Sequence, residues 1–140
     1  MLKSVLVFFC LLSVQYLWAQ EERKIPAEKL TEIDGVTYVE GEKQPFTGTS
    51  FQNHTNGNIG MAGTYKNGKK EGDWVWWYEN GEKQRITQYV GGEKHGKCIW
   101  WYNTGVKKSE IIFENNRNIR QLSWDKNGIK TKNPSFSSFS

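Results

Sequence analysis

The chain has 140 residues and a net charge of +4, and lysine and glutamate are interleaved along its length. This length is enough for one small domain. A charge this mild and this evenly mixed forms no basic stripe of the kind that nucleic-acid binding requires. We therefore expect no nucleic-acid partner.

The first 19 residues have the pattern of a secretory signal peptide. Lys3 gives a positive start, residues 5–12 form a short apolar run, and Ala19 places a small residue before Gln20. The run is shorter than the roughly 20 apolar residues of a transmembrane helix, and an uncleaved anchor is the alternative. We predict export to the periplasm, the cell surface or the medium, with cleavage near Ala19–Gln20.

Cleavage there changes both the charge and the cysteine count. It removes Lys3 and no acidic residue, which lowers the net charge from +4 to +3. It also removes Cys10 and leaves Cys98 as the single cysteine. One cysteine forms no internal disulfide, so the stability of the domain has to come from packing and strand pairing. Cys98 is predicted to be a small apolar residue in a strand, with pairing to another chain as the alternative.

The remainder divides into a polar leader (20–34), a repeat domain (35–130) and a Ser-rich tail (131–140). In the domain, the segment 72–95 repeats as the segment 96–119, a period of 24 residues. The matching positions are Gly72, Trp76, Trp77, Tyr78, Gly81, Lys83 and Tyr89 with Gly96, Trp100, Trp101, Tyr102, Gly105, Lys107 and Phe113. A fixed period in this range indicates a stack of supersecondary units.

Each unit has the pattern of a β-hairpin. Residues 74–78 are aromatic or β-branched, which is typical of a strand, and residues 83–90 form a second strand. Between them Asn80-Gly81 supplies the two positive-φ residues of a tight turn, and Asn-Gly recurs at 56–57, 67–68 and 127–128. A leading half-unit spans 38–41. We predict an all-β fold, an elongated antiparallel meander of about eight to ten strands with almost no helix.

Alternation along the first strand of each unit gives two faces. One face has a large apolar residue in every unit and is predicted to be structural. Its members are Phe51, Val75, Trp77, Ile99, Trp101, Leu122 and Trp124. Stacking between repeats is predicted for the aromatic residue that ends each second strand. This series is Tyr38, Tyr65, Tyr89, Phe113 and Phe136.

The opposite face is aromatic only in the two middle units. A position needed only for the fold should look alike in every unit, so this patch is predicted to be a binding surface. Its residues are Trp74, Trp76, Tyr78, Trp100 and Tyr102. The alternative is that the sheet curls and the patch is core. Tryptophan and tyrosine are enriched at protein–protein hot spots, and flat rings also suit sugars.

No catalytic or metal-binding pattern emerges from the sequence. His54 and His95 lie in different units, and His95 is expected in a solvated turn. The aspartates match no nucleophile pattern, and no cysteine–histidine cluster has zinc spacing. We predict a protein that is not an enzyme and that has no cofactor and no metal.

The segment 65–74, which recurs as 89–98, resembles the bacterial variant of the MORN repeat. The shared pattern is an aromatic residue, Asn-Gly-Lys, a glycine, an aromatic strand and Tyr-x-x-Gly, over about residues 35–130. The resemblance implies a hairpin-per-repeat architecture and a non-catalytic binding role, and some members are labelled antitoxins. Asn116 and Ile119 replace expected glycines, which predicts a degenerate last unit acting as an end cap.

Together these patterns predict an exported interaction module. The expected partner is another envelope or secreted protein. Glycan or peptidoglycan binding through the same rings is one alternative, and an immunity or antitoxin-like role is another. Membrane association is expected to be weak or absent.

Overall fold

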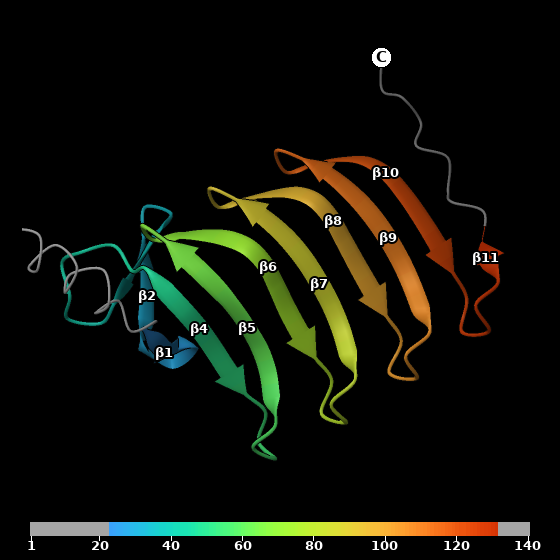
Figure 1. Cartoon of the computed structure of the whole chain (residues 1–140), viewed down its shortest axis with the longest axis horizontal. Helices are drawn as coiled ribbons and strands as arrows, with labels where there is room; N and C mark the ends of the chain where they lie inside the picture. The colour runs from blue at the N-terminus through green and yellow to red at the C-terminus, as the bar shows by residue number, and fades with distance from the viewer. Residues whose placement is uncertain (1–22, 132–140) are drawn as a thin grey trace, which may run out of the picture.

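The computed structural model describes residues 23–131, which form an all-β chain (Figure 1). Nine strands build one sheet in the order β1-β4-β5-β6-β7-β8-β9-β10-β11. Their bounds are β1 Lys24–Pro26, β4 Gly48–Asn53, β5 Ile59–Lys66, β6 Lys69–Trp77, β7 Lys83–Val90, β8 Glu93–Trp101, β9 Lys107–Glu114, β10 Arg117–Trp124 and β11 Lys130–Thr131. The predicted signal peptide and Phe136 lie outside the described residues.

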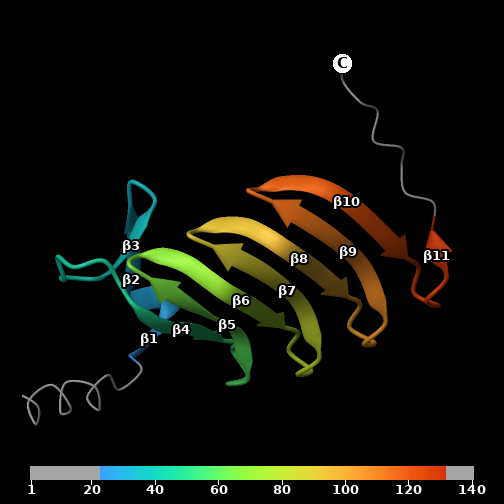
Figure 2. The same ribbon diagram turned by 45° about the horizontal axis from the view of Figure 1, so that its top comes forward.

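From β4 to β11 every strand is antiparallel to the next. The predicted meander of adjacent hairpins is therefore confirmed. The strands bend into arcs, which Figure 2 shows from a second direction. Among residues 23–131, no helix is long and apolar enough to cross a bilayer.

Two kinds of turn alternate along the sheet, one at each end of the hairpins. The two-residue turns 67–68, 91–92 and 115–116 have positive φ at both positions, which suits the twist of a tight hairpin. At the other end, only Gly57, Gly81, Gly105 and Gly128 have positive φ. The prediction of paired positive-φ residues therefore holds for Asn67-Gly68 and is wrong for the other three Asn-Gly pairs.

The reason lies in the length of those three turns. At Asn80-Gly81 the connection runs from Tyr78 to Glu82, with Tyr78 N donating to Glu82 O (2.8 Å) and Gly81 N donating to Tyr78 O (2.9 Å). This is a longer loop in which the glycine alone is left-handed. Asn80 contributes its side chain instead, because its Oδ1 accepts from Glu82 N at 3.1 Å.

The segment predicted as a polar leader contributes secondary structure. β1 pairs with β4 in parallel, which covers one edge of the sheet. The 3-10 helix η1 (Ala27–Lys29) follows, and β2 (Leu30–Ile33) pairs with β3 (Val36–Val39) in a separate two-stranded sheet. Tyr38 belongs to this small sheet, whereas Tyr65 lies in the large sheet. The two tyrosines therefore do not occupy equivalent positions in the structure, although the sequence pattern aligns them. Phe46 packs on the Tyr65 ring instead, with 5.7 Å between centroids.

Four buried side chains form a row across the middle of the large sheet. They are Ser50, Trp74 and Thr87, each 1% exposed, and Cys98, which is 4% exposed. Neighbouring strands bring these positions side by side, since Trp74 pairs with Thr87 and Thr87 with Cys98. We call this side of the sheet the Trp74 face and the opposite side, where Phe51, Val75, Trp77, Ile99, Trp101, Leu122 and Trp124 lie, the Val75 face.

The burial of the two faces is the reverse of the prediction, in which the Val75 face was structural and the Trp74 face was an exposed binding surface. Every one of the seven residues of the Val75 face is half-buried, whereas the fully buried side chains lie on the Trp74 face. Side chains converge on the inner side of a bent sheet and diverge on the outer side, so the burial indicates that the Trp74 face is the inner one. Trp74, one of the five residues of the predicted binding surface, is therefore core.

Candidate interaction face

Trp74 fills the centre of this face. Its indole Nε1 donates to the carbonyl oxygen of Thr64 at 3.1 Å. Its ring contacts Tyr65 edge-on at 4.9 Å between centroids and Tyr89 at 6.2 Å. Gly63 makes room for the ring, because a Cβ atom there would lie 2.1 Å from Trp74 Cδ2. A covered ring with a satisfied donor offers nothing to a partner, so we remove Trp74 from the contact surface.

Tyr78 and Tyr102 join neighbouring units. Tyr78 donates its hydroxyl to the carbonyl oxygen of Trp101 at 2.7 Å, and Tyr102 donates to that of Trp124 at 3.1 Å. His54 holds the equivalent slot in the preceding unit, where its Nε2 lies 2.9 Å from the carbonyl oxygen of Trp77. These three side chains are a ladder of contacts between successive hairpins, which is a structural role.

Trp76 and Trp100 have Arg85 between them. The guanidinium carbon of Arg85 lies 3.5 Å from the centroid of Trp76 and 4.6 Å from that of Trp100. The sheet register creates this arrangement, because Arg85 on β7 pairs with Trp76 on β6 and with Trp100 on β8. Stacking of an arginine on tryptophan faces is a favourable cation–π contact. The three side chains are half-buried.

Arg85 is a candidate that the sequence analysis missed. Its Nε is buried and has no hydrogen-bond partner among the described residues. Burial, as the main cause, lowers the pKa of its guanidinium below the ordinary value. One signal was present in the sequence: the equivalent positions 24 residues away are Met61 and Ser109, so the charge at Arg85 breaks the repeat.

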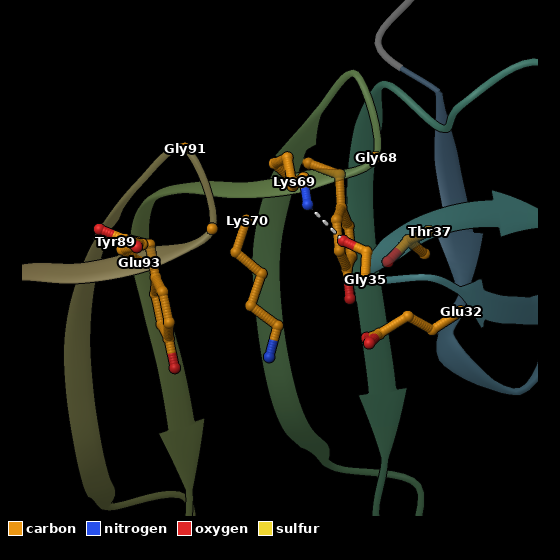
Figure 3. A pocket seen from close by; sticks show the side chains of 11 residues that line it. Glu32, Gly35, Thr37, Gly68, Lys69, Lys70, Tyr89, Gly91 and Glu93 are labelled. Atoms are coloured by element: carbon orange, nitrogen blue, oxygen red, sulfur yellow. Dashed lines mark hydrogen bonds between the residues drawn. The ribbon is translucent and has the colours of Figure 1, made fainter. Parts of the chain in front are cut away.

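Two lysines lie on the same face towards the two-residue turns. Lys70 Nζ is 4.5 Å from the Trp74 centroid and 5.3 Å from that of Tyr89, and Lys94 Nζ is 5.1 Å from that of Phe113. In Figure 3, Lys70 extends into the space between Tyr89 and Glu32. This space is a hollow of about 390 Å³ whose lining includes Tyr65 and Glu93.

The environment of Lys70 is unfavourable to its charge. Burial lowers the pKa of its ammonium below the ordinary value, and the charges of Arg85 and Lys94 lower it further. Glu32 acts in the opposite direction. Neither lysine ammonium forms a hydrogen bond or ion pair with another residue in the described part of the chain. The two ion pairs found there, Arg23–Glu42 and Lys107–Glu110, involve other cations.

The slot of these lysines is filled differently in the first unit. The turns make equivalent backbone contacts: Gly68 N donates to Phe46 O, Gly92 N to Lys70 O and Asn116 N to Lys94 O, at 2.7 to 2.9 Å. Phe46 is fully buried, and the next two units replace its ring with an ammonium group. The fold therefore accepts an apolar residue at this slot, and the lysines are not required by it.

The described residues offer no arrangement suited to acid–base or metal chemistry. His54 contacts a backbone carbonyl, and His95 Nδ1 lies 3.2 Å from Asn115 Oδ1. No group of three or more histidine, cysteine, aspartate or glutamate side chains within residues 23–131 could hold a metal ion. The groups gathered on the Trp74 face are cations and aromatic rings.

Residues 70–90 and 94–115 match the family model of the MORN repeat variant. These two segments are MORN repeats. The match confirms the resemblance over the two units that bear Lys70, Trp76, Arg85, Lys94 and Trp100. MORN repeats form a non-catalytic repeat family, and repeat modules commonly mediate binding. No curated protein and no solved structure matches the chain significantly.

Proposed function

We propose that this MORN-repeat chain is an exported, non-enzymatic interaction module that binds another envelope or secreted protein through the Trp74 face. The observation that supports this proposal is the Trp76–Arg85–Trp100 stack, in which the Nε atom of Arg85 has no hydrogen-bond partner among the described residues. Tryptophan and arginine are the residues that contribute most to hot spots of protein interfaces. The contact surface of the proposal consists of this stack, with Tyr78 and Tyr102 as its structural support.

The stack favours a protein partner over a glycan. Sugar rings bind to the exposed flat face of an aromatic side chain, and here Arg85 lies over the faces of both Trp76 and Trp100. An immunity role remains compatible with the proposal, since such a protein also acts by binding one partner. The immunity role predicts that the chain captures a single partner in a one-to-one ratio.

A capture experiment with matched tryptophan variants tests the proposal. The chain from Gln20 onward contains every residue that the structure describes and serves as bait for an envelope extract. Trp76→Ala/Trp100→Ala alters the Trp74 face, and Trp77→Ala/Trp101→Ala makes the same change in the same units on the Val75 face. We expect the first variant to lose a partner that the second retains. Circular dichroism should show that both variants are folded.

Two results would speak against the proposal. If both folded variants retain the same partners as the wild type, the stack is structural. If binding is lost only with the Trp77→Ala/Trp101→Ala variant, the contact surface lies on the Val75 face. Titration with soluble cell-wall fragments covers the glycan alternative, because ring contacts would change the tryptophan fluorescence.

A further inference from the structure

We propose that the Trp74 face recognises an acidic, extended segment of its protein partner, with Lys70, Arg85 and Lys94 as the groups that receive the carboxylates. This inference rests on the proposed interaction function and specifies the chemistry of the partner. The three cations share one face of three consecutive strands, β6, β7 and β8. None of them forms an ion pair with another described residue.

The first argument is the electrostatics of the face. Lys70, Arg85 and Lys94 are three half-buried cations. Burial is the main cause of the lowered pKa of Lys70, and repulsion by the charges of Arg85 and Lys94 lowers that pKa further. Such repulsion is costly unless a ligand offsets it. The lysine slot also accepts a phenylalanine, as Phe46 demonstrates. A cation retained where an apolar side chain fits indicates a role outside the fold.

The second argument is the orientation of the rings. Arg85 lies over the faces of Trp76 and Trp100, and Lys70 lies over those of Trp74 and Tyr89. An aromatic ring has a negative face and a positive edge. With one face of each ring turned to a cation, the ring edges and the terminal N–H groups of Arg85 are the groups proposed to receive a ligand. Both attract a carboxylate, and the guanidinium fork matches its two oxygens.

The third argument is the spacing. Lys70 and Lys94 lie two strands apart, which corresponds to roughly 10 Å. Arg85 is on the strand between them, but it pairs with Trp76 and Trp100, which lie further along β6 and β8 than the two lysines. An extended chain advances about 3.3 Å per residue. A segment of about eight residues therefore covers both the spacing across the strands and the offset of Arg85 along them. A flat lipid surface has no such access to half-buried groups on the inner side of a bent sheet, and the covered ring faces disfavour a glycan.

One carboxylate modulates the site from its rim. Glu32 of the β2–β3 hairpin faces Lys70 across the hollow in Figure 3 and raises the pKa of its ammonium. Glu93 lies on the same rim. A bound acidic segment would be repelled by Glu32. Replacing Glu32 with glutamine should therefore strengthen binding, although the substitution adds no contact.

The test uses a defined probe and charge-matched variants. The probe is a fluorescein-labelled peptide of about eight residues, a length set by the strand spacing, rich in glutamate with one central tyrosine. Its glutamine counterpart is the control peptide. Lys70→Gln/Arg85→Gln removes two cations from the Trp74 face. Lys83→Gln/Lys97→Gln removes two exposed lysines from β7 and β8, and Lys83 lies beside Trp77 and Trp101 on the Val75 face.

We expect the glutamate peptide to bind to the wild type and to weaken with added salt, while the glutamine peptide does not bind. Lys70→Gln/Arg85→Gln should lower the affinity by roughly tenfold or more, as expected for losing charge-assisted hydrogen bonds. Lys83→Gln/Lys97→Gln should leave it within about twofold, because exposed charges on the far face are screened. Lys94→Gln is a milder second variant, which removes one cation whose ammonium lies over the Phe113 ring.

Three results would overturn the inference. These are no binding of the glutamate peptide to the wild type, equal binding of the glutamine peptide, and equal losses for the two double variants. Stronger binding of anionic vesicles or of polygalacturonate at the same cations would assign the face to a different ligand. If the peptide fails while Trp76→Ala/Trp100→Ala still abolishes capture of the partner, the interaction function stands and only its acidic ligand is wrong.

Discussion

At the scale of single residues, the fold depends on how large and small side chains meet in the buried row. Trp74 lies over Gly63, which has no side chain to obstruct the ring. In the next unit the equivalent positions hold Thr87 and Cys98, which are 1% and 4% exposed and whose Oγ1 and Sγ lie 3.2 Å apart. Each unit therefore fills the same space with a different pair.

The first prediction concerns this pairing. Gly63→Thr should destabilise the protein by about 3 kcal/mol or more, because the new side chain overlaps the Trp74 ring. Gly63→Thr/Trp74→Cys copies the pair of the next unit and should cost less than the two single substitutions added together. Urea unfolding measures all three variants. Additive costs would contradict the claim that the two residues share one space.

The second prediction concerns the cost in folding stability of burying the charge of Lys70. Its pKa is lowered mainly by burial, so Lys70→Met should stabilise the fold by up to about 1 kcal/mol at neutral pH. The methionine keeps a contact with the rings and loses the binding charge. A variant that is less stable than the wild type at neutral pH would show that the cation–π contacts outweigh the cost of burial.

The same substitution has a defined pH dependence. Between the lowered pKa of Lys70 in the folded protein and its ordinary value of 10.5, the unfolded state binds more protons, so wild-type stability rises with pH. Lys70→Met has no such group. Its advantage should be largest below the folded pKa and shrink as the pH approaches 10.5. Thermal unfolding at several alkaline pH values follows the difference, and a constant difference would refute the assignment.

At the scale of the elements, successive hairpins are joined by more than strand pairing. Tyr78, Tyr102 and His54 each reach a backbone carbonyl of the following unit. Asn56 and Asn80 do the same near the turns, with Nδ2 donating to Glu79 O and Asn103 O at 3.1 and 3.0 Å. In a repeat stack, such interface contacts add to the stability of the individual units.

The third prediction separates this role from binding. Tyr78→Phe keeps the ring and removes the hydroxyl bond to Trp101 O, so it should cost about 1 kcal/mol of stability. Capture of the partner should be unchanged, since the hydroxyl is used within the protein. Denaturant unfolding and the capture experiment provide the two readings. Full stability combined with lost binding would return Tyr78 to the contact surface.

At the scale of the whole molecule, the sequence predicted the architecture because its signals are local. Asn67-Gly68 marks a turn by its own conformational preference, and the 24-residue period fixes how often the turns recur. The burial of Trp74 depends on Gly63 in another strand, and several register shifts interrupt the pairing of these strands. Alternation within one strand therefore separated two faces without revealing which of them is inner.

The candidate site was predicted only in part for the same reason. Trp76 and Trp100 were identified because the outer units have polar residues at the equivalent positions. Arg85 is in the second strand of its unit, and only the pairing register of the strands brings it beside the two tryptophans. The lysine slot was missed because Phe46 occupies the position equivalent to Lys70 and Lys94 and has a different side-chain chemistry. Cross-strand neighbours, more than the repeat itself, define the proposed binding face.

The central claim is that the Trp74 face binds and the Val75 face does not. The most direct test follows the indole N–H resonances of the wild-type chain from Gln20 onward by NMR while the glutamate-rich peptide is added. Trp76 and Trp100 should shift in proportion to binding, and Trp77 and Trp101, their neighbours on the opposite face, should not. Shifts of Trp77 and Trp101 with unchanged Trp76 and Trp100 would contradict the account.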